Sequence, residues 1–216
     1  MIDEQQSGEA RPAPQRHGSF WRELPILLGV AIVVAILVRA FVLQTFYIPS
    51  ESMENTLQIN DRVLVNKLVY DFRAPRRGEI IVFNSPPEWR GDPSETDFIK
   101  RVIGVGGDHV VCCDTQHHLV INGKSLNEPY LDGDGANLSA SPDQFDITVP
   151  QGRLWVMGDN RYHSGDSREQ YLKFHDINKA TIATSAVIGR AFVIFWPLNH
   201  FSWLSVPGSY DQIPSS

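Results

Sequence analysis

The longest hydrophobic run in the chain covers residues 24–43, which are almost wholly apolar. A helix of about 20 residues, rising about 1.5 Å per residue, is about 30 Å long, which matches the hydrocarbon core of a bilayer. Helices of soluble proteins carry a polar face, and this run has none. The pattern predicts a transmembrane helix over residues 24–46. Its one charge, Arg39, lies near the end, where the side chain reaches the lipid head groups.

Basic residues flank this apolar run unequally. Arg11, Arg16 and Arg22 precede it, and the next basic residue after it is Arg62. Positive charge collects on the cytoplasmic side of a membrane span, so we expect the N-terminus in the cytoplasm. A cleavable secretory signal is the competing interpretation. Its apolar core is shorter and ends in small residues, whereas Gln44-Thr45-Phe46-Tyr47 follows here, so the pattern favours an uncleaved anchor.

After Tyr47 the apolar residues recur at the spacing of short β-strands. The expected strands are 62–69, 79–83, 98–105, 109–111, 118–121, 153–157 and 186–196. Asn122-Gly123 is a strong signal for a two-residue hairpin turn, and Pro197 stops the last strand. One short helix is expected within residues 176–186. Short strands separated by turns predict a mainly antiparallel β domain.

An aromatic stretch follows near the C-terminus. Residues 192–206 are apolar and aromatic, but Pro197, Asn199 and His200 interrupt them. A second membrane span needs an unbroken apolar run, so the pattern favours a strand and loop that lie on the membrane.

The net charge of the chain speaks against partners that are strongly negative. The chain has 216 residues and a formal net charge of −6, so bulk charge does not favour binding to nucleic acid or to anionic lipid. Its two cysteines are the neighbours Cys112 and Cys113. Consecutive side chains of a strand point to opposite faces, which favours two free or buried thiols over a disulfide between them.

Candidate metal ligands are few. Residues 132–135 look like the start of a calcium loop, but its twelfth position is Asp143 rather than glutamate, and flanking helices are not expected. No His or Cys stands at the remaining ligand spacings of a zinc site. We therefore expect no metal and no cofactor.

A serine-containing segment, Pro49-Ser50-Glu51-Ser52-Met53, follows the apolar run within a few residues. The residues after Pro49 favour a turn. A serine hydroxyl is a poor nucleophile until a base removes its proton. Ser50 precedes Ser52 by two residues and can offer a hydroxyl to the same reacting centre. The segment alone fits a serine-rich linker and a nucleophilic serine equally well.

Lys100 is the candidate base. In the expected strand 98–105 it shares a face with Phe98 and Val102. Apolar neighbours desolvate the ammonium group and lower its pKa toward values at which the neutral amine acts as a base. Taken alone, a strand lysine whose amine reaches water is the favoured interpretation.

A polar loop follows the expected strand 153–157. Residues 158–168, Gly-Asp-Asn-Arg-Tyr-His-Ser-Gly-Asp-Ser-Arg, are dense in hydrogen-bonding groups. Such a loop can orient a buried lysine and close the site with an ion pair between Asp166 and Arg168. By itself the segment also fits a polar turn.

Together these segments resemble the type I signal peptidases, membrane-bound Ser/Lys endopeptidases that cut signal peptides from exported preproteins. The Pro-Ser-x-Ser-Met motif, the lysine motif at 98–104 and the paired motifs at 158–161 and 164–168 occur in the family's order and approximate spacing. The resemblance implies that Ser52 is the nucleophile and Lys100 the general base. It also implies that the Ser52 amide and the Ser50 hydroxyl form the oxyanion hole.

The same resemblance implies roles for supporting residues. Ser164 is expected to hydrogen-bond the lysine amine, Asp166 and Arg168 to form a structural ion pair beneath the site, and Met53 to form a wall of the substrate pocket. The chain departs from the family at Tyr162-His163, where Asp-Asn is common. We expect this imidazole to face water rather than to perturb the lysine.

The implied fold class is mainly β, with an N-terminal transmembrane helix followed by a largely antiparallel β-sheet catalytic domain of the signal peptidase and LexA-like type. The expected parts are a cytoplasmic disordered tail (1–23), the transmembrane helix (24–46), an extracytoplasmic catalytic domain (47–206) with a variable insert (108–152), and a flexible C-terminal tail (207–216). The expected partners are signal-peptide-bearing preproteins and the lipid bilayer, without nucleic acid. The chain is expected to act as a monomer, single-pass in the cell membrane.

Two other classes compete with this assignment. A self-cleaving repressor shares the Ser/Lys chemistry, but it is soluble and carries a DNA-binding domain, and the anchor and the acidic charge speak against it. A membrane-tethered β module that binds envelope partners without catalysis would tolerate loss of Ser52 or Lys100.

Overall fold

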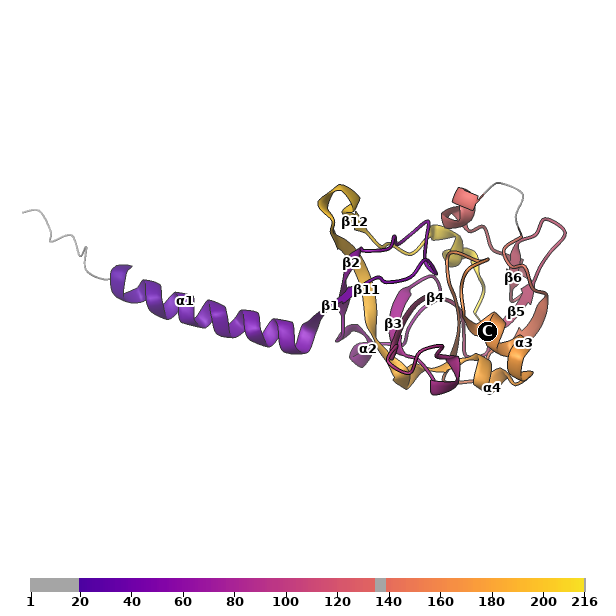
Figure 1. Ribbon diagram of the computed structural model, residues 1–216, viewed down its shortest axis with the longest axis horizontal. Coiled ribbons are helices and arrows are strands. Elements are labelled where there is room, and N and C mark those ends of the chain that lie inside the picture. The colour runs from indigo at the N-terminus through magenta and orange to yellow at the C-terminus, as the bar shows by residue number, and fades with distance from the viewer. Residues whose placement is uncertain (1–19, 135–138, 216) are drawn as a thin grey trace, which may run out of the picture. The chain divides into compact units, whose positions relative to one another are not determined.

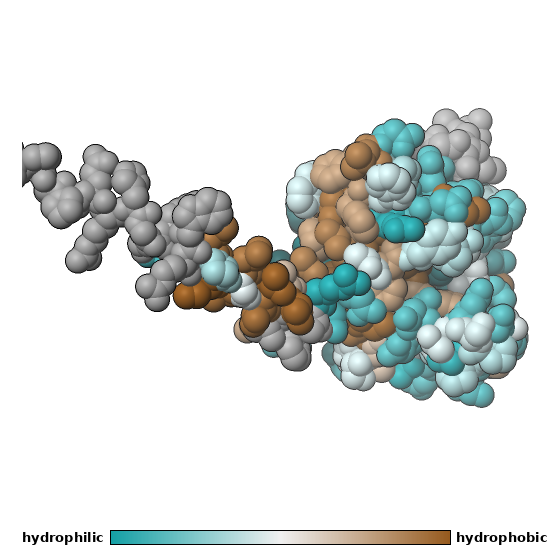
Figure 2. Space-filling view, turned by 60° about the vertical axis from the view of Figure 1, so that its left-hand side comes forward, coloured by the Kyte–Doolittle hydropathy of each residue, from teal (hydrophilic) through white to brown (hydrophobic). Residues whose placement is uncertain are grey.

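The computed structural model describes residues 20–134 and 139–215, and the chain divides into two units between Arg39 and Ala40. α1 (Phe20–Leu37) is the helix of the first unit, and a π-helical turn, η1 (Val38–Val42), follows it across this boundary. Apolar side chains of α1 are exposed, as Figure 2 shows in brown along the helix. In the part of the chain that the structure describes, no helix is both long and apolar enough to cross a membrane.

The helix is shorter than the 24–46 that the sequence predicts. α1 ends at Leu37, and residues 43–46 belong instead to strand β1 (Leu43–Tyr47). β1 pairs in antiparallel register with β2 (Arg62–Asn66), and this pairing satisfies the backbone groups along the edge of β2. The β-branched and aromatic residues of β1 also favour a strand over a helix. Residues 1–19 of the expected tail lie outside the described residues.

The main sheet of the second unit has eight strands, all antiparallel, in the order β1-β2-β11-β3-β4-β9-β10, with β12 paired to β11 (Figure 1). Its further strands are β3 (Ile80–Asn84), β4 (Asp97–Val105), β9 (Arg153–Met157), β10 (Ile182–Ala183), β11 (Val187–Trp196) and β12 (Ser202–Trp203). The predicted mainly antiparallel β domain is confirmed. Four of its predicted strands, 79–83, 98–105, 153–157 and 186–196, lie within one residue of β3, β4, β9 and β11.

A smaller sheet has the strand order β7-β6-β5-β8. Its strands are β5 (His109–Cys112), β6 (Leu119–Ile121), β7 (Lys124–Ser125) and β8 (Phe145–Thr148). Asn122 and Gly123 join β6 to β7 with positive φ angles of 51° and 77°, so the predicted hairpin turn is confirmed. Strand β8 is not among the strands predicted from the sequence, although its buried residues alternate with exposed ones as in a half-buried strand.

Short helices fill the connections. They are α2 (Val69–Phe72), α3 (Ser167–Phe174) and α4 (Ile177–Ala180), with 3-10 turns η2 (Pro87–Trp89), η3 (Pro129–Asp134), η4 (Thr184–Ala186), η5 (Leu198–His200) and η6 (Gly208–Gln212). α4 lies within the region where one short helix is predicted. Helix α3 is not predicted from the sequence; it begins where the Asp166 carboxylate accepts the Arg168 N–H. Asp166 followed by Glu169 three residues later is the signal that marks this start.

The C-terminal residues pack against the domain, unlike the flexible tail that the sequence predicts for 207–216. Tyr210 and Ile213 are buried, at 5% and 7% exposure. Gly78, with φ of 80°, has no room for a side chain, because a Cβ there would lie 2.7 Å from the Tyr210 ring. The aromatic stretch 192–206 forms the end of β11, then η5 and β12, so the strand and loop favoured by the sequence are confirmed there.

Cys112 and Cys113 form a disulfide, so the prediction of two free thiols is wrong. That prediction placed both residues in one strand, where neighbouring side chains diverge. In the structure β5 ends at Cys112, and the alternation of the strand does not extend to Cys113.

Candidate active site

Buried apolar side chains and backbone hydrogen bonds fix the loop that carries Ser52. Met53 and Leu57 are fully buried, and the Leu57 N–H donates to the Met53 carbonyl at 2.7 Å. At the end of the loop, the Asp61 carboxylate accepts the Gln58 N–H at 2.8 Å. Burial of these apolar side chains contributes on the order of 1.5–3 kcal/mol each. The loop thus holds Ser52 in place at 7% exposure.

Lys100 reaches this serine from β4, an inner strand of the main sheet between β3 and β9. Its Nζ lies 2.7 Å from Ser52 Oγ, and the lysine is only 4% exposed. The Phe98 ring lies 5.6 Å from the same amine. Two residues 48 positions apart in the chain are therefore in direct hydrogen-bond contact, away from bulk water.

The surroundings of Lys100 change its proton affinity. Burial is the dominant cause, and it lowers the pKa of the amine to about 8. The negative charges of Asp166, Asp159 and Glu95 act in the opposite direction, and the Arg168 charge adds to the lowering. A buried amine with this pKa is populated in its neutral form within reach of physiological pH, so it can accept a proton.

The loop after β9 packs against Ser52 without space for a further atom. The Asn160 N–H donates to the Ser52 carbonyl at 3.2 Å. At Gly158 a Cβ atom would lie 2.2 Å from both the Ser52 carbonyl oxygen and Ser164 Oγ. Only glycine is accommodated at this position, because real Cβ atoms do not come so close to neighbouring atoms.

Ser164 lies in this packed region but does not form the hydrogen bond with Lys100 that is expected from the sequence. Among the described residues, its buried Oγ has no hydrogen-bond partner of good geometry. The hydroxyl is nevertheless close enough to the Asp166 carboxylate to help lower the pKa of that group. The lysine amine bonds Ser52 instead.

Asp166 and Arg168 form a buried, bidentate ion pair. Arg168 Nε lies 2.9 Å from Asp166 Oδ1, and Nη2 lies 2.7 Å from Oδ2. The second oxygen also accepts the Gly158 N–H at 3.0 Å. Burial alone would raise the pKa of Asp166, but the Arg168 guanidinium and these hydrogen bonds outweigh it and hold the pKa below the usual value. The pair therefore fixes the loop as well as the start of α3.

A second ion pair, which the sequence analysis missed, connects all the segments of the site. Arg101, next to Lys100, lies with Nε 2.9 Å and Nη2 2.6 Å from the two oxygens of Asp159, next to Gly158. Asp159 also accepts the hydroxyl of Thr56, in the Ser52 loop. The sequence signal for this ion pair was a positive charge directly after Lys100 and a negative charge directly after Gly158. Breaking a buried pair by removing one partner costs about 3–5 kcal/mol.

A cleft of about 530 Å³ opens beside Ser52 and Lys100. Its walls are residues 46–52 on one side and 94–100 on the other. Ser50 lies in the first wall, with its Oγ 3.4 Å from Ser52 Oγ. His163 also borders the cleft and is exposed. Met53, which the sequence places at the pocket wall, is fully buried in the core and is not among the residues that border this cleft.

The described residues contain no group of three or more His, Cys, Asp or Glu side chains placed to hold a metal ion. Residues 135–138, next to the aspartates with the look of a calcium loop, lie outside the described residues.

The family model for signal peptidase, peptidase S26, matches residues 21–196. The chain belongs to this family. It is 39% identical to a probable signal peptidase I of Mycobacterium leprae, over 85% of this chain and 78% of that protein. It is 38% identical to a signal peptidase I of Mycobacterium tuberculosis, over 88% and 76%. A probable signal peptidase I-2 of Synechocystis is 40% identical, over 91% and 83%.

Family membership makes this chain a type I signal peptidase, a hydrolase of peptide bonds. The match includes the Ser52 loop, β4 and the loop after β9, so all the segments that meet at the cleft lie within it.

Substitution of Gly158 tests how tightly these segments are packed. In Gly158→Ala the methyl group must displace the Ser52 carbonyl or Ser164, and a shift of about 1 Å costs about 100-fold in rate. We expect that loss in kcat/KM for a model preprotein, with about 1–3 kcal/mol lost in denaturant unfolding. Gly91→Ala is the matched control, since nothing lies within 4 Å of its Cβ position. Equal activity of the two variants would contradict the close packing at Gly158.

Proposed function

We propose that this signal peptidase removes signal peptides from exported preproteins with Ser52 as nucleophile and Lys100 as general base. The observation that carries the proposal is the 2.7 Å contact between Lys100 Nζ and Ser52 Oγ beside an open cleft. The lowered pKa of the buried lysine supports it, because a base must be unprotonated before it accepts the serine proton.

In the proposed reaction neutral Lys100 takes the proton of the Ser52 hydroxyl as Oγ attacks the scissile carbonyl. The protonated lysine then gives that proton to the leaving amine, and an acyl-enzyme remains on Ser52. Lys100 next takes a proton from the water that attacks the ester, and it returns this proton to Ser52 Oγ as the bond between that oxygen and the acyl carbon breaks. Each proton passes through one amine, so the cycle returns to its starting state.

The oxyanion of each tetrahedral intermediate needs donors. We assign this role to the Ser52 amide and the Ser50 hydroxyl, supported by the 3.4 Å between the two serine Oγ atoms. Loss of one such donor lowers the rate by about 100- to 1,000-fold.

Ser164 is assigned to the acyl-enzyme stage. Once Ser52 Oγ is part of an ester, it no longer receives a full hydrogen bond from the lysine amine. Ser164 Oγ is buried beside Gly158 and, among the described residues, has no well-formed hydrogen bond, so it is free to take over as the partner of Lys100. The Asp166–Arg168 pair keeps the loop in place for this exchange.

The substrate is a chain segment in extended form. Residues before the cut would lie along the cleft between 46–52 and 94–100, adding a strand by backbone hydrogen bonds. We assign shallow pockets for small side chains at the first and third positions before the scissile bond.

The proposed place of action is the outer surface of the cell membrane, with the N-terminus in the cytoplasm and the catalytic domain outside. Support comes from the exposed apolar side chains of α1, such as Ile26, Leu27 and Leu28 at 61–66% exposure. In the second unit the large side chains of Trp196, Leu198, Phe201 and Trp203 are exposed as well. Such surfaces favour contact with lipid.

Lys100→Met tests the base directly. Methionine fills a similar volume without an amine, so cleavage of a model preprotein should fall by at least about 1,000-fold. The fold should be at least as stable to denaturant, because a buried ammonium and its desolvation penalty are removed. Lys173→Met, at an exposed site on α3, is the matched control and should keep full activity. A Lys100→Met protein that still cleaves would exclude the lysine as base, and Ser52→Ala should be equally inactive.

The pH dependence follows from the pKa of Lys100. Protonated lysine cannot act as base, so kcat/KM should rise as the pH increases through about 8. Glu95→Gln removes a negative charge that raises this pKa, so the rising limb should move to lower pH, by less than about one pH unit for an exposed charge. Glu88→Gln makes the same charge change at an exposed site that does not influence Lys100 and should leave the profile unchanged. A shift of the Glu95→Gln limb to higher pH would contradict the assignment.

A further inference from the structure

The Cys112–Cys113 disulfide lies at the end of β5, in the smaller sheet, away from the catalytic dyad in the chain. Cys112 is buried among the apolar side chains of that sheet, at 3% exposure, whereas Cys113 is partly exposed. These are the only two cysteines in the chain. Cys113 therefore offers the sulfur that a thiol in solution reaches first.

A disulfide between neighbours contributes little to stability through the unfolded chain. The entropy that a crosslink removes grows with the length of the loop that it closes, and here the sequence separation is 1. Its effect must lie in what the two sulfurs hold in the folded protein.

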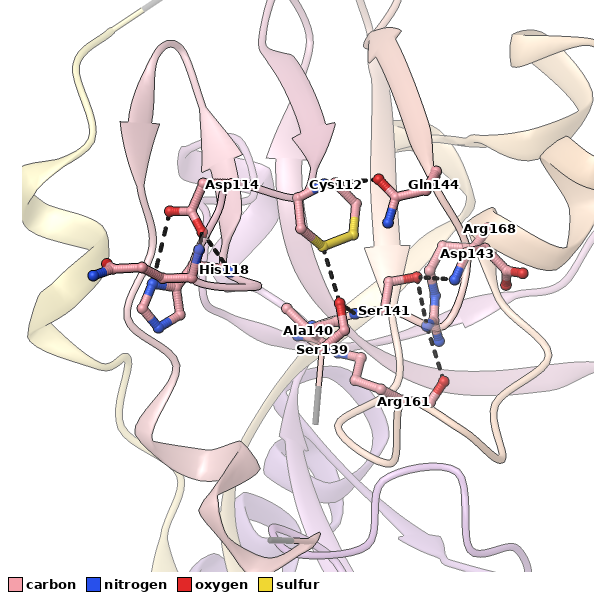
Figure 3. Close-up of a disulfide and its surroundings, with 12 residues drawn as sticks. Cys112, Asp114, His118, Ser139, Ala140, Ser141, Asp143, Gln144, Arg161 and Arg168 are labelled. Atoms are coloured by element: carbon pink, nitrogen blue, oxygen red, sulfur yellow. Dashed lines mark hydrogen bonds and ion pairs between the residues drawn. A yellow bond between two sulfur atoms is a disulfide. The ribbon is translucent and has the colours of Figure 1, made fainter. Parts of the chain in front are cut away.

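Cys113 holds residues 139–144 at both ends of that segment, through its disulfide sulfur at one end and its backbone N–H at the other. Ser139 Oγ lies 3.3 Å from Cys113 Sγ, and because a disulfide sulfur carries no hydrogen, the serine is the donor. The Cys113 N–H donates to the Gln144 side-chain oxygen at 3.1 Å. Figure 3 shows Ser139 and Gln144 on either side of the sulfur pair. The position of Cys113 thus bears directly on where 139–144 lies.

The same segment contacts two arginines of the catalytic loop. Arg161 Nη1 donates to the Ala140 carbonyl at 2.6 Å, and Arg168 Nη1 donates to Ser141 Oγ at 3.3 Å (Figure 3). Both arginines are buried, at 3% and 2% exposure. Arg168 is also the partner of Asp166, whose charge raises the pKa of Lys100. A continuous set of hydrogen bonds and ion pairs therefore runs from the sulfur pair to the loop beside the dyad.

We propose that Cys112–Cys113 is a redox-reactive site, reduced by dithiols, and that its reduction lowers peptidase activity by loosening residues 139–144 and with them the loop 158–168. The proposal rests on the assignment of this loop to the active site. In the disulfide, the two sulfurs fix one another. In the reduced form, each thiol rotates about its own χ1, and Ser139 loses its fixed acceptor.

The chemistry is an ordinary thiol–disulfide exchange. A thiolate of the dithiol attacks Cys113 Sγ, the bond between the two cysteine sulfurs breaks, and Cys112 leaves as a thiolate that takes up a proton. The second thiolate of the reagent attacks its own sulfur in the mixed disulfide and releases Cys113 as the second thiolate, which is then protonated. Two electrons pass to the protein, and the reagent becomes a cyclic disulfide.

The test uses the full-length protein in buffers of defined ratio of reduced to oxidised dithiothreitol. Free thiols are counted by alkylation and mass spectrometry, cleavage of a model preprotein gives the rate, and hydrogen exchange is followed in 139–144 and 158–168. We expect reversible reduction, a rate about 3- to 10-fold lower in the reduced protein, and faster exchange in both segments.

Two variants separate the site from general effects of the reagent. Cys112→Ser combined with Cys113→Ser should show the lower rate at every buffer ratio, because no other cysteine is present. Ser139→Ala should keep a reducible disulfide but show a smaller change in exchange, whereas Ser205→Ala, at an exposed site, should respond like the wild type.

The proposal is overturned if the pair resists reduction, or if it is reduced while exchange in 158–168 and the rate stay the same. A protein that cleaves no preprotein in either state would contradict the proposed function instead. In that case the thiol count and the exchange data still decide whether the disulfide controls the loop.

Discussion

The whole site depends on keeping the Lys100 amine buried against Ser52 Oγ. Lys100 is only 4% exposed, and the hydration that its ammonium form loses on burial lowers the pKa of the amine. The same burial keeps water from competing for the serine proton. The negative charges of Asp166, Asp159 and Glu95 raise this pKa, whereas the positive charge of Arg168 lowers it. A balance of burial and charge therefore sets the pKa of this amine, and any change that admits water or removes one of these charges alters the fraction of it that is neutral.

The position of that amine depends on contacts outside the dyad. Arg101, Asp159 and Thr56 connect β4, the loop after β9 and the Ser52 loop in one buried polar cluster. Gly158 then lets two of these segments approach to a distance that no side chain would permit. Lys100 and Ser52, from distant parts of the chain, stay within hydrogen-bond distance because such supporting groups are satisfied internally.

Much of this could be predicted from the sequence, because period-2 alternation and turn residues are local signals. They located β9 and the Asn122-Gly123 hairpin, and the motifs pointed to Ser52 and Lys100. The helix boundary was less predictable, since residues 43–46 follow the apolar run without a turn residue and become a strand by pairing with β2. The burial of Met53 and the closure of the Cys112–Cys113 disulfide depend on contacts that no local pattern encodes. Ser164 shows the same limit, since its expected contact with Lys100 is not formed.

The protonation of Lys100 itself tests the account most directly. NMR of protein with isotopically labelled lysine, recorded from about pH 6 to 11 and assigned with Lys100→Met, follows this one amine through its titration. The account predicts a pKa of about 8, well below the usual 10.5. An amine that titrates near 10.5 would be charged wherever the enzyme works, and a charged lysine could not take the proton of Ser52.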